Sequence, residues 1–201
     1  FDNIVISGMK FEDEDGDGVQ DAGEIGLSGW TVNLTKNGQP SGSTTTGENG
    51  SYSFTDLGPG TYTVKESTQE GWTQTFGMSG YSITATSADN SSDNNFGNFD
   101  NIVISGMKFE DEDGDGVQDE GEVGLSGWTV QLTKDGQPSG STTTGQDGSY
   151  SFNDLGPGVY TVKESTQEGW TQTFGMSGYS VTATSADDSR NNNFGNFDNI
   201  T

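Results

Sequence analysis

Apolar and polar residues alternate along several short runs of this chain. The run from Trp30 to Thr35 alternates cleanly, so one face carries Trp30, Val32 and Leu34. The same period of two recurs in three further runs: Tyr52 with Phe54, Tyr62 with Val64, and Tyr81 with Ile83 and Ala85. Turn-forming pairs such as Asn37-Gly38 separate the runs, and no stretch has the 3.6-residue period of a helix. The pattern predicts an all-β fold of seven or eight short strands in each β-sandwich.

The chain repeats itself after 98 residues. Residues 1–98 and 99–196 align without a gap and differ at only twelve positions, and residues 197–201 begin a third copy. Each copy has the size of a small domain and is far longer than a solenoid unit. We therefore predict tandem domains at 1–98 and 99–196. The junction around Asn101 is shorter than a flexible linker, so we expect the domains to be held in a nearly fixed, extended relation.

The charge balance narrows the possible partners and activities. The chain has 31 acidic and 7 basic residues, a net charge of −24, and neither His nor Cys. Such a surface repels nucleic acid and anionic lipid, so we expect neither nucleic-acid binding nor direct membrane contact. Disulfides, thiol chemistry and a histidine base are excluded, and no other nucleophile–base set is apparent, so we do not expect an enzyme.

Low aliphatic content with high net charge is typical of disordered chains, which conflicts with the alternating runs. If the domains fold, their cores are small, and a further stabilising element is needed.

The acidic segment from Asp13 to Glu24 supplies such an element. It matches the twelve-residue calcium loop, with Gly18 at the sharp turn and the Val19 carbonyl as a backbone ligand. The predicted ligands are Asp13, Asp15, Asp17, Val19, Asp21 and Glu24 in the first copy, and Asp111, Asp113, Asp115, Val117, Asp119 and Glu122 in the second. All are hard oxygen donors, which favours Ca²⁺ over zinc or copper. Without a cation, seven carboxylates between residues 12 and 24 would repel one another.

The segments flanking the loop are not helical, so we expect a structural site rather than a signalling switch. A second acidic cluster at Asp89 and Asp93 is either another ion site or a turn-rich, solvated loop.

Several segments together resemble the B-type repeats of serine-aspartate repeat (Sdr) surface proteins and, more loosely, the collagen-adhesin (Cna) B-type fold. They are Ile6–Phe11, the acidic loop, Gly26–Val32, Thr45–Phe54, Leu57–Glu66 and Asn95–Asn98, and the resemblance covers both copies. It implies tandem prealbumin-like (Cna B / SdrD B-type) β-sandwich domains that calcium stabilises. It also implies an extracellular, cell-surface location and a spacer role, with neighbouring repeats as partners and any host or extracellular ligand bound elsewhere in the parent protein.

Cna-type relatives can carry an internal Lys–Asn isopeptide bond whose formation a buried Glu or Asp promotes. The matching positions are Lys10, Glu66 and Asn98, and in the second copy Lys108, Glu164 and Asn196. Glu66 shares its strand face with Tyr62 and Val64 and is expected to point inward. However, we expect Val5, Met9 and Phe11 on the inner face of the first strand, which would turn Lys10 outward. The sequence therefore favours an ordinary surface lysine and an intact mass equal to that of the sequence.

These observations predict a non-enzymatic, calcium-stiffened spacer of a cell-surface adhesin-like protein. The alternative is a binding module that recognises carbohydrate or protein. That alternative would be favoured by an exposed aromatic cluster or by sharp surface differences between the copies. The twelve differences are scattered and mostly conservative, which favours the spacer.

Overall fold

The computed structural model describes residues 3–199, and within that range the regular elements are all β-strands. Residues 200 and 201, the last two of the predicted third copy, lie outside the described residues. The chain divides into two compact units, Phe1–Asp100 and Asn101–Thr201. Between residues 3 and 199 there is no helix long and apolar enough to cross a membrane. The predicted all-β class is confirmed.

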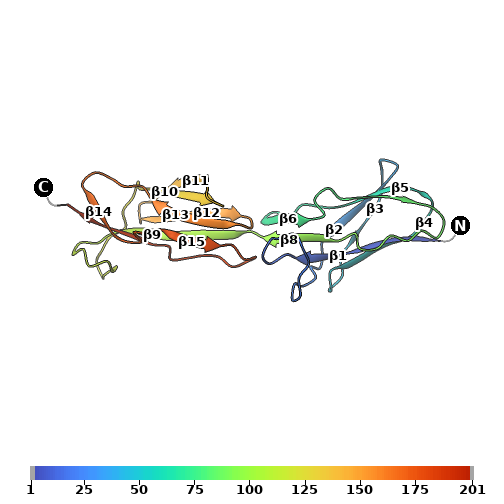
Figure 1. The fold of residues 1–201 in the computed structure, drawn as a ribbon, viewed down its shortest axis with the longest axis horizontal. Coiled ribbons are helices and arrows are strands. Elements are labelled where there is room, and N and C mark those ends of the chain that lie inside the picture. The colour runs from blue at the N-terminus through green and yellow to red at the C-terminus, as the bar shows by residue number, and fades with distance from the viewer. Residues whose placement is uncertain (1–2, 200–201) are drawn as a thin grey trace. The chain divides into compact units, whose positions relative to one another are not determined.

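The first unit contains eight strands in two four-stranded sheets (Figure 1). The strands are β1 (Ile4–Glu12), β2 (Thr31–Lys36), β3 (Gln39–Thr45), β4 (Ser51–Leu57), β5 (Gly60–Glu66), β6 (Trp72–Phe76), β7 (Tyr81–Ala85) and β8 (Phe96–Asp100). One sheet has the order β4-β1-β8-β6 and the other β3-β2-β5-β7.

The second unit repeats this arrangement. Its strands are β9 (Ile102–Glu110), β10 (Thr129–Lys134), β11 (Gln137–Thr143), β12 (Ser149–Leu155), β13 (Val159–Glu164), β14 (Trp170–Phe174), β15 (Tyr179–Thr182) and β16 (Phe194–Asp198). Their sheets have the orders β12-β9-β16-β14 and β11-β10-β13-β15. A single residue, Asn101, separates the end of β8 from the start of β9.

The first and last strands of each unit lie side by side. β1 pairs antiparallel with β4 and parallel with β8, with Lys10 opposite Phe96 and Glu12 opposite Asn98. β9 and β16 pair in the same register. Parallel pairing of strands that are far apart in sequence places the beginning and the end of each repeat next to one another.

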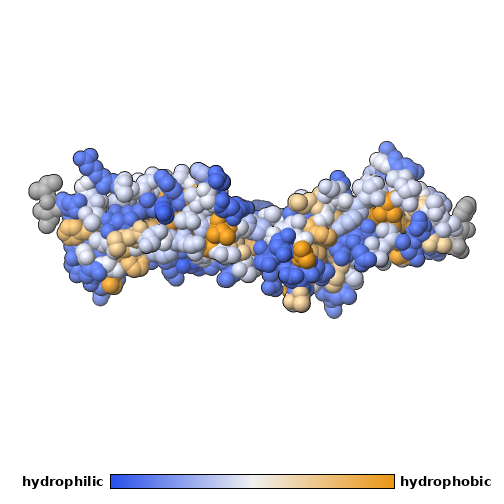
Figure 2. Space-filling model, viewed as in Figure 1, coloured by the Kyte–Doolittle hydropathy of each residue, from blue (hydrophilic) through white to orange (hydrophobic). Residues whose placement is uncertain are grey.

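The core of the first unit lies between the two sheets. The alternating runs supply it, because successive side chains on a strand point to opposite faces. Its buried members are Ile4, Ile6, Val32, Leu34, Tyr52, Phe54, Tyr62, Val64, Ala85 and Phe96. Most outward positions are polar, and the visible face of the molecule is largely hydrophilic with scattered apolar spots (Figure 2). Neither disulfide nor free cysteine contributes, since the chain has no Cys.

Candidate metal loop and buried lysine site

The acidic loop leaves the end of β1 and folds its carboxylates back onto its own backbone. The side chain of Asp13 is buried and accepts hydrogen bonds from the backbone N–H groups of Asp17 (3.1 Å) and Gly18 (2.9 Å). At the other end, the Glu24 carboxylate accepts from the N–H groups of Glu14 and Asp21, both at 2.9 Å. The first and last predicted ligands therefore close the loop from its two ends.

Carboxylate oxygens gather in both loops. In the first repeat, oxygens of Asp13, Asp15 and Asp17 lie within 4.8 Å of one another. In the second repeat, two such triplets share Asp113 and together join all five predicted carboxylates: Asp111, Asp113 and Glu122, and Asp113, Asp115 and Asp119. Oxygen donors at this spacing fit a hard divalent cation such as Ca²⁺. Val19 and Val117, predicted to bind through their carbonyls, have exposed side chains.

The glycine at the sixth loop position has the conformation that the sharp turn requires. Gly18 has φ +78°, and a Cβ there would lie 3.2 Å from the carbonyl oxygen of Thr75. Gly116 repeats this geometry with φ +81°. An L-residue at this position would be strained, so the predicted turn is confirmed.

The crowded carboxylates affect one another's protonation. Burial raises the pKa of Glu24, and the charges of Asp13 and Asp15 raise it further, against the backbone hydrogen bonds from Asp21 and Glu14. In the second repeat, the charge of Asp115 is the main cause that raises the pKa of Asp119. A bound cation would relieve this repulsion.

Lys10 does not point to solvent, and the sequence-based expectation for it is wrong. Its side chain is fully buried, as is that of Lys108 in the second repeat. Ile4 and Ile6, not Val5 and Met9, face the core, so Lys10 follows them on the inner face. Gly8 has the same parity, and a Cβ there would lie 2.2 Å from the carbonyl oxygen of Asn94. Because Gly8 has no side chain, β1 approaches the backbone of Asn94 closely at this inward position.

The inward lysine of the first repeat pairs with Glu66, one of the two other residues of the isopeptide alternative. Lys10 Nζ lies 3.4 Å from Glu66 Oε2, and both side chains are almost completely buried. Asn98, on the neighbouring strand β8, is 2% exposed. Neither oxygen of the Glu66 carboxylate nor Oδ1 of Asn98 has a hydrogen bond of normal geometry in the described residues. Burying polar groups without hydrogen bonds is costly, so their presence calls for an explanation such as a chemical role.

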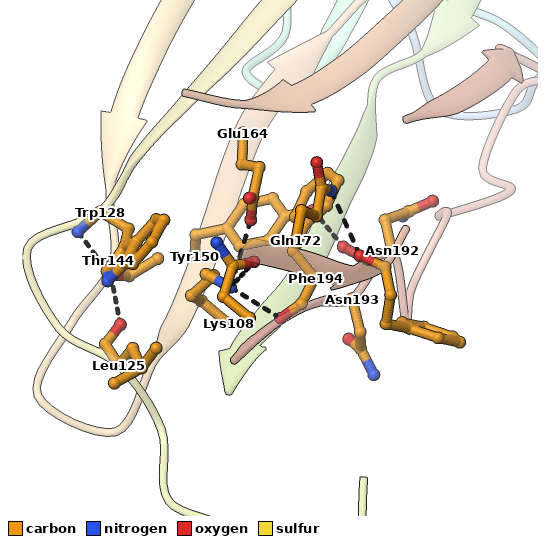
Figure 3. A network of polar contacts seen from close by, with 12 residues as sticks. Lys108, Leu125, Trp128, Thr144, Tyr150, Glu164, Gln172, Asn192, Asn193 and Phe194 are labelled. Carbon is orange, nitrogen blue, oxygen red and sulfur yellow. Dashed lines mark hydrogen bonds and ion pairs between the residues drawn. The ribbon is translucent and has the colours of Figure 1, made fainter. Parts of the chain in front are cut away.

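The second repeat brings the lysine and the glutamate slightly closer (Figure 3). Lys108 Nζ lies 3.2 Å from Glu164 Oε2 and donates a hydrogen bond to Oδ1 of Asn196 at 2.5 Å. It also donates to the carbonyl oxygen of Phe194 at 3.4 Å. The lysine amine and the asparagine side-chain amide are therefore in contact.

Burial shifts both partners of the ion pair toward their neutral forms. It lowers the pKa of Lys10 to about 8, although the Glu66 charge opposes this, and Lys108 behaves in the same way. Burial raises the pKa of Glu66, against the Lys10 charge and the Asn98 side chain. A neutral amine beside a protonated carboxyl is the pair that acid–base chemistry on an amide requires.

Trp30 completes the site, a role that the sequence did not indicate. As predicted, Trp30 is a core residue, and Lys10 Nζ lies 4.3 Å from the centre of its ring. The hydroxyl of Thr46 accepts from the N–H of Trp30 and donates to the carbonyl of Leu27. Figure 3 shows the same chain of contacts through Trp128, Thr144 and Leu125. The indole shields the amine from water.

A family model for the SdrD B-like domain matches residues 5–103 and again residues 101–199. The chain belongs to the SdrD B-like domain family. The predicted resemblance is confirmed, and the family is one of adhesin repeats rather than an enzyme class.

Curated relatives of these SdrD B-like repeats carry the Sdr name. The chain is 39% identical over 195 residues to serine-aspartate repeat-containing protein F of Staphylococcus epidermidis (strain ATCC 12228 / FDA PCI 1200), an alignment over 90% of this chain and 12% of the relative. It is 36% identical over 186 residues to serine-aspartate repeat-containing protein D of Staphylococcus aureus (strain Newman), over 86% of this chain and 14% of the relative. The chain thus spans only a small part of these relatives' length.

Solved structures with a similar arrangement include pilins. A streptococcal ancillary pilin aligns with 99% of this chain and 63% of its own, at 17% identity and a TM-score of 0.43. The minor pilin GBS52 of Streptococcus agalactiae aligns with 100% of this chain and 98% of its own, at 15% identity and a TM-score of 0.39.

The loop that carries the second acidic cluster of the SdrD B-like repeats has a structural use. In the first repeat, Oδ1 of Asn90 accepts a hydrogen bond from the N–H of Val5 at 2.8 Å. In the second, Oδ1 of Asp188 accepts from the N–H of Val103 at 2.6 Å. The loop is therefore tied to the first strand of its repeat whether the position is Asn or Asp. An ion at this cluster stays a prediction.

Proposed function

We propose that this chain is part of the stalk of a cell-surface adhesin-like protein, where its repeats separate a distal functional region from the cell. The observation that carries the proposal is the near-verbatim repetition of one SdrD B-like domain, with a single residue between β8 and β9. Duplicating a domain almost unchanged adds length and stiffness, whereas it adds little to a single binding site or active site. Because a stalk carries load along its chain, pulling on the two ends tests this function directly.

Calcium is the first stabiliser that we propose for each repeat. The loop carboxylates of the first repeat (Asp13, Asp15, Asp17, Asp21 and Glu24) and the carbonyl of Val19 would hold it, with the equivalent set in the second repeat. Its positive charge would offset the repulsion among carboxylates that crowd within one short loop.

A covalent Lys–Asn bond is the second stabiliser that we propose. The neutral amine of Lys10 attacks Cγ of Asn98, so that an Nζ–Cγ bond forms and the Cγ–Nδ2 bond breaks. Glu66 takes a proton from Nζ and passes one to the leaving nitrogen, which departs as ammonia. No oxidant or cofactor is needed. The burial of all three groups and the 3.4 Å separation of Lys10 from Glu66 support this chemistry.

Intact mass tests the covalent bond. We expect the purified chain to weigh less than its sequence by one ammonia per repeat, because each repeat contains its own buried triad. Glu66→Ala should restore one ammonia and Glu164→Ala the other. Glu70→Ala, at an exposed position of the following turn, is the matched control and should keep both bonds. A wild-type mass equal to that of the sequence would refute the proposed bond.

A further inference from the structure

The metal loop and the buried lysine site share one short segment of β1. Lys10 lies near the end of β1, and Asp13, three residues further on, is the first residue after the strand. The chain that leaves the loop returns to this segment, where the N–H of Leu27 donates to the carbonyl of Lys10 and the N–H of Glu12 donates to the carbonyl of Ile25, both at 2.9 Å. An antiparallel bridge joins Phe11 and Gly26 between these two hydrogen bonds. Both ends of the loop are therefore fastened to the residues around Lys10.

A second contact reaches the asparagine. The N–H of Asp13, the first loop ligand, donates to the carbonyl of Asn98 at 2.9 Å. This bond continues the parallel register in which Glu12 lies opposite Asn98. The second repeat reproduces both contacts, because Asp111 donates to Asn196 and Leu125 to Lys108, again at 2.9 Å. The backbone of the proposed amide reactant is thus held by the residue that opens the loop.

We propose that cation binding by the loop and formation of the Lys–Asn bond are coupled, so that each favours the other. This inference rests on the proposed function, since it requires both the ion and the bond. Without a cation, repulsion among the loop carboxylates acts directly on residues 10–13 and on their hydrogen bond to β8. Displacements of about 1 Å are enough to slow a reaction between neighbouring groups about a hundredfold.

The coupling must act in both directions. Once the bond joins β1 to β8, Asp13 is held in its loop position before the cation arrives, and less ordering is needed on binding. By thermodynamic linkage, ordering of this segment raises the affinity for the cation by some factor. Cation binding then raises the equilibrium constant for ordering the segment by the same factor. Typical coupling energies correspond to about 5- to 150-fold in affinity.

A calcium titration of the two-repeat chain measures the effect on affinity. In Glu66→Gln, we expect the loop of the first repeat to bind Ca²⁺ at least about 5-fold more weakly, while the loop of the second repeat keeps its wild-type affinity as an internal reference. Lys10→Met is a second variant without the bond and should weaken the same loop, whereas Glu70→Gln should weaken neither. Near-ultraviolet circular dichroism in saturating calcium checks that each variant is folded. Unchanged affinity in the folded Glu66→Gln and Lys10→Met chains would overturn the coupling.

The rate of ammonia loss measures the opposite direction. Cell-free synthesis in calcium or in the calcium-selective chelator EGTA, sampled over time by intact mass, should show slower bond formation with EGTA. In Asp17→Asn with calcium present, only the first repeat should be slow. Equal rates in all conditions would refute the coupling and leave the bond intact. A wild-type chain that never loses ammonia in calcium would instead refute the proposed bond itself, so the two failures are distinguishable.

Discussion

Removing the Lys–Asn bond is expected to cost each repeat about 4–5 kcal/mol of unfolding free energy, by analogy with a disulfide that closes a loop of about 100 residues. The proposed bond from Lys10 to Asn98 would enclose nearly the whole repeat, so it would restrict the unfolded chain almost as much. The double variant Lys10→Met/Glu66→Gln removes the bond without leaving a charged group buried. We expect guanidinium unfolding of this chain to show the first repeat unfolding well before the second.

Glu66→Ala should destabilise the first repeat further than the double variant does. It leaves the buried Lys10 amine without its partner, and removal of one member of a buried pair costs about 3–5 kcal/mol. Because burial lowers the pKa of Lys10, part of this cost is avoided by loss of the amine's proton. If the double variant unfolds at the wild-type denaturant concentration, the bond does not stabilise the repeat.

Chelating calcium should produce the second large effect. A ligand at a hundredfold excess over its dissociation constant stabilises the folded state by about 2.7 kcal/mol per site. For a domain of this size that corresponds to a fall in melting temperature of roughly 10–20 °C after chelation. Scanning calorimetry with calcium and with EGTA measures it.

Loop variants localise the calcium effect. Asp17→Ala should lower the melting temperature of the first repeat alone and leave the second with its own loop. Glu70→Ala removes an exposed acidic residue outside both acidic clusters and serves as the matched control. A chain whose melting temperature is the same with and without chelator would contradict the calcium role.

The alternating runs were sufficient to predict the strands and the all-β class, because a half-buried strand must alternate. The gathering of the loop carboxylates and the glycine turn could be predicted as well, since a twelve-residue loop is local in sequence. Gly18 does adopt the required positive φ. The orientation of Lys10 could not be predicted in this way. Both Lys10 and Phe11 are buried at the end of β1, so alternation alone does not decide which parity faces the core.

The residues that surround Lys10 could not be predicted from the sequence either. Its ion pair with Glu66 depends on the packing of one sheet against the other, and the place of Asn98 on the neighbouring strand depends on the parallel pairing of β1 with β8. The place of Trp30 over the amine depends on the same packing. Sequence patterns predicted the Trp30 side chain as core, but they carry no information about which polar group it covers.

Single-molecule pulling on the two ends of the chain tests the stalk account most directly. Force enters each repeat through its first strand and leaves through its last, and the proposed Lys–Asn bond would join these two strands. In calcium, the wild-type chain should therefore extend without unfolding steps. The Glu66→Ala/Glu164→Ala chain should show two steps of roughly 300 Å each, since about 3.3–3.6 Å per residue is released between the former bond positions. Steps of that length in the wild-type chain would contradict the account.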